Sequence, residues 1–98
     1  MDFEKNRNQF GNANIALDGY GDSISNPVQI RGIKSTVLGV QAEKLFISNK
    51  YGQEDHDWYF VEQELILKDG AFDAITIRLS DSTFEKIYFD IGEFYGKF

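Results

Sequence analysis

A chain of 98 residues is the usual size of one domain and can bury enough surface for one hydrophobic core. Its apolar fraction of 42% argues against a wholly disordered chain, and its net charge of -6 disfavours nucleic acid as a partner, since Lys and Arg supply most of the affinity for phosphate. The absence of cysteine excludes disulfides, cysteine nucleophiles and thiolate metal sites.

The sequence also bears on membranes. No run reaches the roughly 18 to 20 apolar residues that a membrane-spanning helix needs. The first residues lack the apolar core of a signal peptide. We therefore expect a cytoplasmic protein with no membrane partner.

Charge is distributed unevenly along the chain. Residues 1–49 hold five basic and five acidic residues, whereas residues 50–98 hold five basic residues against eleven acidic ones. The second half therefore carries the whole net charge, and a basic partner would be attracted to it. The plainer interpretation, that moderate negative charge keeps a small protein in solution, stands beside this one.

Residues 1–27 are rich in Asn, Gly, Asp and Ser, and their apolar residues follow neither the helical nor the strand period. We expect a loosely structured N-terminal arm, with residues 14–17 and 28–33 as candidates for one or two extra strands. The loop from Asp18 to Asp22 is no EF-hand, because Ser23 and Gln29 stand where that loop needs glycine and glutamate.

Residues 35–51 fit an α-helix that Ser35 or Thr36 caps and that Gly52 ends. Gly39 costs about 1 kcal/mol of helix propensity relative to alanine, so it either permits a close approach to the sheet or is a tolerated defect. Apolar residues at helical spacing predict the inward stripe, which is Leu38, Ala42, Leu45 and Phe46, with Val37 and Ile47 at its margins.

The segment from Gln53 to Asp57 holds the only histidine, His56, between two aspartates. A histidine beside carboxylates can act as a general base or a metal ligand. Adjacent residues of one loop do not converge on a point, however, and no second histidine completes a site. We interpret this segment as an acidic, solvated loop.

Three strand-like segments follow, at residues 58–67, 72–79 and 84–91, and their odd-numbered positions are nearly all aliphatic or aromatic. If these positions share a face, the loop of the first turn must contain an odd number of residues. We expect three or five residues around residues 68–71, with Gly70 left-handed. The same parity places the second turn at residues 81–83. The resulting pairs are Phe60 with Ser80, Glu62 with Arg78, Thr76 with Tyr88 and Ile77 with Ile87.

The predicted fold class is therefore α+β. We expect one domain over residues 1–98, built as a three-stranded antiparallel meander, extended by one or two N-terminal strands and packed through its odd face on one main helix. Asp90 is placed to cap a short final turn through Glu93.

The even-numbered positions of the same strands mix aromatic with charged side chains, which is the composition of protein interfaces. Three occupants are compatible with this face: the N-terminal arm, a second copy of the chain, and another protein. The candidate binding residues are Trp58, Phe60, Glu62, Glu64, Phe72, Arg78, Phe84, Lys86 and Tyr88.

No motif assigns a reaction, since neither GxGxxG nor GxxxxGK occurs. We predict no enzyme, no catalytic residue, no cofactor and no metal site. The favoured hypothesis is a small acidic protein-binding module, inhibitor- or immunity-like, whose partner is a basic protein such as a nuclease. The alternatives are a ligand-binding or catalytic domain with an aromatic pocket of Trp58, Phe60 and Tyr88, and a structural homodimer.

Overall fold

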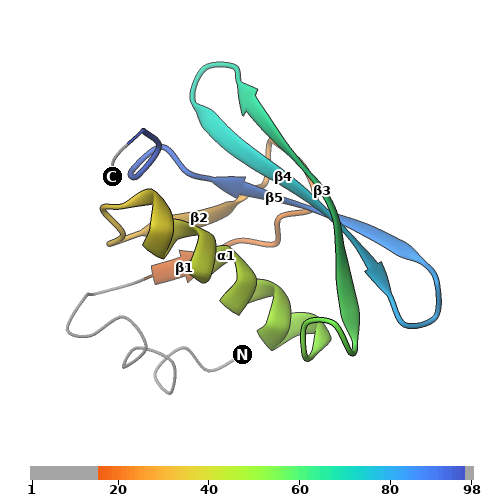
Figure 1. The fold of residues 1–98 in the computed structure, drawn as a ribbon. Coiled ribbons are helices and arrows are strands. Elements are labelled where there is room, and N and C mark those ends of the chain that lie inside the picture. Colours follow the sequence, from red (N-terminus) through yellow and green to blue (C-terminus); the bar gives the residue numbers. More distant parts are fainter. Residues whose placement is uncertain (1–15, 97–98) are drawn as a thin grey trace.

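The structure is a computed structural model that describes residues 16–96. Within that range, five strands form one mixed sheet that packs against one helix (Figure 1). The elements are β1 (Ala16–Asp18), β2 (Val28–Arg31), α1 (Thr36–Tyr51), β3 (Trp58–Leu67), β4 (Ala71–Leu79) and β5 (Phe84–Asp90).

The strand order is β1-β2-β5-β4-β3, so β1 and β3 are the two edges of the sheet. The meander of β3, β4 and β5 is antiparallel, as predicted, and β2 joins it by pairing parallel with β5. The α+β class is thus confirmed, with a sheet that the N-terminal strands make mixed.

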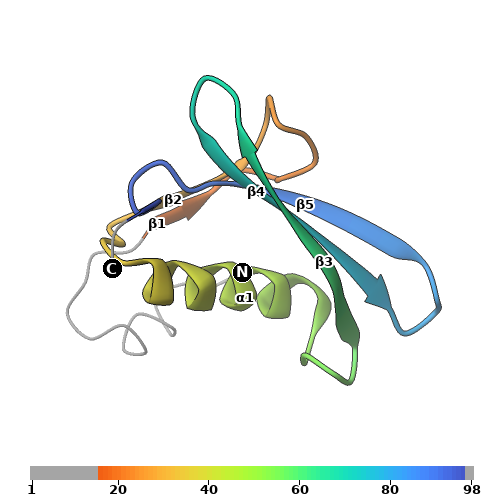
Figure 2. The ribbon, with the colours of Figure 1, turned by 45° about the horizontal axis from the view of Figure 1, so that its top comes forward.

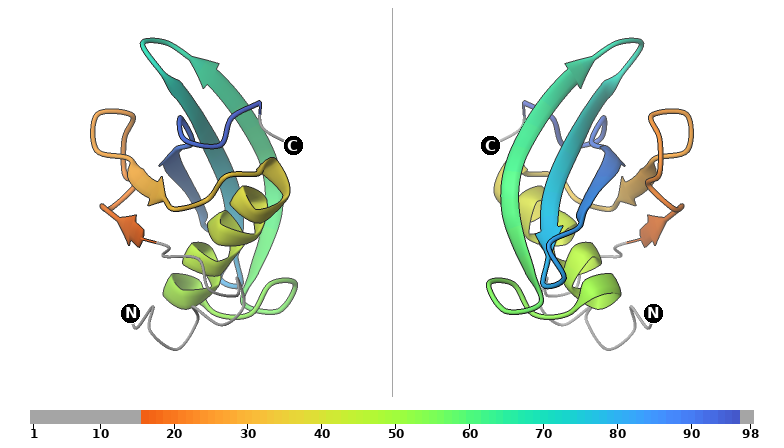
Figure 3. Two further views of the ribbon diagram at one scale, coloured as in Figure 1. Left: turned by 90° about the vertical axis from the view of Figure 1, so that its left-hand side faces the viewer. Right: turned by 90° about the vertical axis from the view of Figure 1, so that its right-hand side faces the viewer.

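Helix α1 lies across one face of the sheet, and no helix covers the opposite face within the described range (Figures 2 and 3). Ser35 is the N-cap, because its hydroxyl accepts a hydrogen bond from the Leu38 N–H at 3.3 Å. Gly52 ends the helix with a positive φ of 114°, and its N–H donates to the Ser48 carbonyl. Both ends therefore lie where the sequence predicted them.

The buried side of α1 differs from the predicted stripe, because Leu38 and Leu45 are only partly buried and Val37 is exposed. The buried residues are Gly39, Ala42, Glu43, Phe46 and Ile47. The helix is thus rotated about its axis relative to the prediction, with Gly39 and Glu43 turned inward. The cause is Phe94, whose ring lies so close to Gly39 that a Cβ at this position would overlap it. Gly39 thus permits close packing, but against the segment after β5 and not against the sheet.

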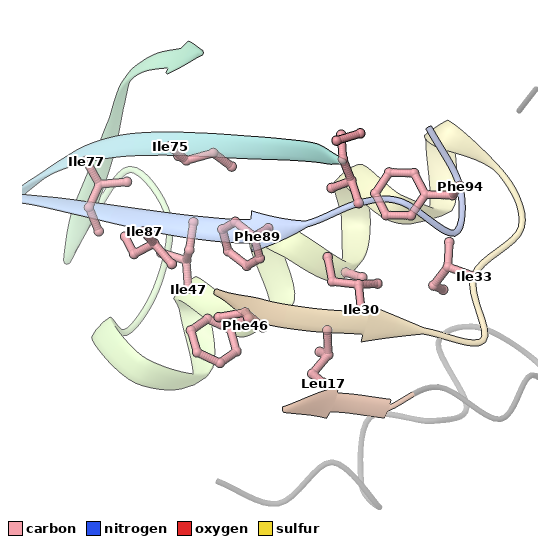
Figure 4. Close-up of a cluster of buried hydrophobic side chains, with 14 of the residues drawn as sticks. Leu17, Ile30, Ile33, Phe46, Ile47, Ile75, Ile77, Ile87, Phe89 and Phe94 are labelled. Atoms are coloured by element: carbon pink, nitrogen blue, oxygen red, sulfur yellow. The ribbon is translucent and has the colours of Figure 1, made fainter. Parts of the chain in front are cut away.

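The core fills the space between α1 and the odd-numbered row of the meander (Figure 4). Ile75 and Ile77 of β4 and Ile87 and Phe89 of β5 are all buried. Phe46 meets Phe89 edge to face, with ring centroids 5.7 Å apart. The prediction that the helix covers the odd row of β4 and β5 is confirmed.

Both hairpins keep the predicted parity, and the first turn lies within the predicted residues 68–71, one residue earlier than the predicted strand pairs imply. Leu67 pairs with Ala71 across a three-residue loop in which both Asp69 and Gly70 have positive φ. The second turn lies one residue earlier than predicted, because Arg78 pairs with Phe84 and the Leu79 N–H donates to Thr83. Every β5 partner consequently shifts by two residues, which preserves the faces.

A β-bulge in β3 was not predicted, and it corrects the register. Glu62 pairs with Thr76, but Phe60 pairs with Ile77, so Val61 is the additional residue between them. Because one extra residue reverses the alternation, the even-numbered positions before the bulge turn toward the helix side. The predicted pairs were wrong for two reasons: both turns lie one residue earlier than those pairs require, which changes the partners of Glu62, Thr76 and Ile77, and the bulge further displaces Phe60. Thr76 pairs with Lys86 and Ile77 with Glu85.

The ends of the described range complete the fold. Residues 16–27 form β1 and a loop that β5 holds through a hydrogen bond from the Tyr88 N–H to the Gly21 carbonyl. The remainder of the predicted N-terminal arm lies outside the described residues. After β5, the Asp90 carboxylate accepts the Gly92 N–H at 3.0 Å and begins the predicted final turn. None of the described helical residues forms a segment with the length and hydropathy needed to cross a membrane.

Candidate functional site

The face of β3, β4 and β5 that points away from α1 is called the outer face here. Cross-strand pairing arranges its side chains in four rows, because residues directly opposite each other project to the same side. The rows are Tyr59–Arg78–Phe84, Glu62–Thr76–Lys86, Glu64–Ala74–Tyr88 and Ile66–Phe72–Asp90.

The outer face bears both charged and aromatic groups, and several of them contact one another. Arg78 lies over the Tyr59 ring at 4.6 Å from its centroid. Lys86 lies 3.6 Å from the Glu64 carboxylate and 5.6 Å from the Tyr88 ring centroid. Exposed pairs of this kind stabilise a fold by only about 0 to 1 kcal/mol, so a partner can replace them at little cost.

Seven of the nine predicted binding residues lie on the outer face, and two do not. Trp58 is 1% exposed in the core, where its Nε1 donates a hydrogen bond to the Gly52 carbonyl at 3.0 Å. Phe60 pairs with Ile77 and so belongs to the helix side. The seven are Glu62, Glu64, Phe72, Arg78, Phe84, Lys86 and Tyr88.

The bulge also decides two further points. The aromatic pocket of Trp58, Phe60 and Tyr88 does not form, because Tyr88 faces the side of the sheet opposite to the other two. Tyr59, which parity had placed in the core row, instead joins the outer face beside Arg78. A bulge leaves only a weak trace in a single sequence. The inward turn of Trp58 and Phe60 and the outward turn of Tyr59 were therefore not predicted.

Strand β3 is an edge strand of the sheet (Figure 3), and its side chains are exposed on both faces along most of its length. Leu65 and Leu67 are 47% and 61% exposed, although they pair with Asp73 and Ala71 and so face the helix side. Apolar side chains therefore border the outer face along this edge. A long, exposed, partly apolar edge is a common place for another chain to pair or pack.

The acidic loop before β3 has a structural explanation. The Asp57 carboxylate accepts the Gln53 N–H at 2.7 Å and lies 3.3 Å from the His56 ring. These interactions, the backbone hydrogen bond first, lower the pKa of Asp57. The loop thus closes on itself, and the exposed His56 belongs to no group of three or more possible metal ligands among the described residues.

Two carboxyl groups lie buried between the helix and the sheet, and the sequence analysis had singled out neither. Glu43 of α1 is 1% exposed and Asp73 of β4 is 5% exposed. Burial raises the pKa of Glu43 to about 10, and Asp73 adds to the rise by accepting a hydrogen bond from the protonated form and by its negative charge. Neither Glu43 oxygen has a partner of good hydrogen-bond geometry, so the contact with Asp73 is a loose one.

A pocket of about 200 Å³ opens beside these carboxyls. Asp73 lines it together with apolar residues from α1, β3 and the segment after β5, among them Val40, Leu65 and Phe94. One signal pointed to Asp73: it is an acidic residue in the odd-numbered, buried row between Ala71 and Ile75. For Glu43 the helix pattern gave no such signal.

Comparison of the chain with protein-family models, curated proteins and solved structures finds no match in any of the three.

Proposed function

We propose that this chain is a small, non-catalytic protein-binding module that docks a basic protein on its outer face. The observation that carries the proposal is a three-stranded face, uncovered by any described helix, that bears both aromatic and charged side chains. Phe84 is 61% exposed there. Monomeric proteins rarely expose large, partly apolar faces, and binding surfaces favour aromatic residues and Arg.

The charge of the molecule supports a basic partner. Glu62 on the outer face makes no ion pair with a described residue. At the nearby end of the sheet, a hydrogen bond from the Ser80 N–H to the Asp57 carbonyl brings the acidic loop at residues 53–57 beside the loop that carries Asp81. The chain as a whole has a net charge of -6, which accelerates encounter with a positively charged protein. An inhibitor- or immunity-like role against a basic enzyme such as a nuclease fits this chemistry.

The test is affinity capture on the immobilised full-length chain, followed by purification of each captured protein and titration calorimetry. We expect a basic protein whose Kd weakens by about tenfold or more when the salt concentration rises from 50 to 500 mM, because salt screens surface charges. The same protein should protect backbone amides of β3, β4 and β5 from hydrogen exchange.

Two matched variants decide which face is used. Glu62→Lys and Glu85→Lys change the net charge equally at exposed strand positions, but Glu85 pairs with Ile77 and lies on the side of the sheet opposite to Glu62. Binding should weaken in Glu62→Lys and remain in Glu85→Lys. Equal affinities of the two variants, or a chain dimer that Glu62→Lys alone dissociates, would refute the proposal, and the dimer would assign the face to self-association.

A further inference from the structure

The pocket beside Asp73 lies on the helix side of the sheet, next to the β3 edge. Its half-exposed residues Val40, Leu65 and Tyr95 come from three different elements, whereas Phe94 and Asp73 are buried within it. Because Leu65 belongs to an edge strand, a partner that lies on the outer face can reach the pocket around that edge.

We propose that this pocket binds a lysine side chain of the partner protein, with the ammonium group against the Asp73 carboxylate and the aliphatic stem against the apolar walls. The inference rests on the proposed function, in that it names the partner residue which a basic protein would present. It adds a second contact point that the outer face does not include.

The size of the pocket restricts the occupant. Sites for whole small-molecule ligands usually measure roughly 300 to 1,000 Å³. At about 200 Å³, this pocket is smaller and matches a single side chain. Its walls are largely apolar, as Val40, Leu65 and Phe94 show, so the part of the occupant that they surround must be hydrocarbon.

The charge of the pocket supplies the second restriction. Asp73 is 5% exposed, and no basic side chain of residues 16–96 makes an ion pair with it. A buried carboxylate without a counter-ion is costly, and a cation that approaches it recovers part of that cost. Glu43, buried more deeply, is a neutral acid whose contact with Asp73 is loose, since neither of its oxygens has a partner of good geometry. The charge of Asp73, which no basic side chain among residues 16–96 balances, therefore points to a hydrogen-bond-donating cation.

Lysine satisfies both restrictions better than arginine does. Its ammonium is a compact point charge on a flexible four-carbon stem, whereas the guanidinium of arginine is a wide planar fork. A pocket of about 200 Å³ therefore accommodates the stem and lets the three N–H donors of the ammonium approach Asp73. A metal ion is disfavoured, because the described residues contain no group of three or more ligating side chains.

The test is an NMR titration of the full-length, ¹⁵N-labelled chain with two probes, Nα-acetyl-lysine methylamide and Nα-acetyl-norleucine methylamide. The probes share the aliphatic stem and differ in the ammonium group. We expect the lysine probe to shift the amide signals of Val40, Leu65 and Tyr95 in a saturable manner, and the norleucine probe to leave them unchanged. Equal shifts with both probes, or none with either, would overturn the inference.

Variants then locate the contact. Asp73→Asn should reduce the affinity for the lysine probe by about tenfold or more, the effect of losing one charge-assisted hydrogen bond. Glu85→Gln should leave this affinity unchanged. If Asp73→Asn does not fold, Val40→Phe, a change at the exposed rim, should block entry instead. Unaltered binding in the folded variant would show that the pocket is not the site.

The outcomes also separate this inference from the proposed function. If Glu62→Lys weakens binding of a basic partner while the lysine probe has no effect, the inference of a lysine pocket is overturned and the proposed docking face stands. Binding of the lysine probe that Asp73→Asn abolishes, with no basic protein captured, would support the pocket and count against a protein partner.

Discussion

Replacing Glu43 with glutamine should stabilise the protein at neutral pH. Glu43 is buried with a pKa raised from 4.5 to about 10, so the native state keeps it protonated at pH 7 while the unfolded chain ionises it. The native state therefore binds one proton more than the unfolded state, and the free energy of unfolding falls as pH rises. A glutamine keeps the shape of the side chain and does not ionise.

The magnitude follows from the two pKa values. The contribution of Glu43 to stability is complete below pH 4.5 and declines from there until the pH reaches about 10, at about 1.4 kcal/mol per pH unit. At pH 7 the loss already amounts to about 3 kcal/mol, which Glu43→Gln should recover. Asp57 and Asp81 have lowered pKa values and titrate at acid pH, so they do not contribute to this slope.

The assay is urea unfolding of the wild type, Glu43→Gln and Glu85→Gln, measured by tryptophan fluorescence between pH 6 and pH 9. Trp58 is the only tryptophan and lies in the core, so its emission reports unfolding. We expect the stability of the wild type and of Glu85→Gln to fall across this range, and that of Glu43→Gln to change little. Asp73→Asn should reduce the slope without abolishing it, because burial is the largest cause of the shift. If the free energy of unfolding depends on pH in the same way for the wild type and Glu43→Gln, the claim that Glu43 is protonated in the native state is refuted.

Three further substitutions test the packing, each by its change in the free energy of unfolding. Gly39→Ala should destabilise the protein by about 1 to 3 kcal/mol, because overlap with the Phe94 ring outweighs the gain of about 1 kcal/mol in helix propensity; a stabilised variant would contradict this packing. Ser35→Ala should cost about 1 kcal/mol by removing the N-cap, whereas Ser35→Asp should retain stability; equal losses in both would exclude capping. Trp58→Phe should cost about 1 to 3 kcal/mol, since the Gly52 carbonyl loses its donor and the core loses volume, and a change below about 0.5 kcal/mol would disprove the burial of this side chain.

The features that local chemistry controls were predictable from the sequence. Ser35 and Gly52 bound the helix because capping needs only a hydroxyl acceptor at one end and a residue that tolerates positive φ at the other. The odd-numbered row that contains Ile75 and Ile87 identified the buried face of the meander because strands alternate with a period of two. The same reasoning placed Glu62 and Arg78 on the outer face.

The remaining features depend on contacts between segments that are distant in the sequence. The bulge at Val61 is defined by pairing with β4, and it alone sends Trp58 into the core and Tyr59 to the outer face. The close approach of Phe94 to Gly39 likewise sets which side of the helix is buried, and so places Glu43 inside. Periodicity within one segment records how its own side chains alternate, whereas the partner strand and the packing of the C-terminal turn determine which of them meet. The buried carboxyl pair and its pocket therefore arise only in the tertiary structure.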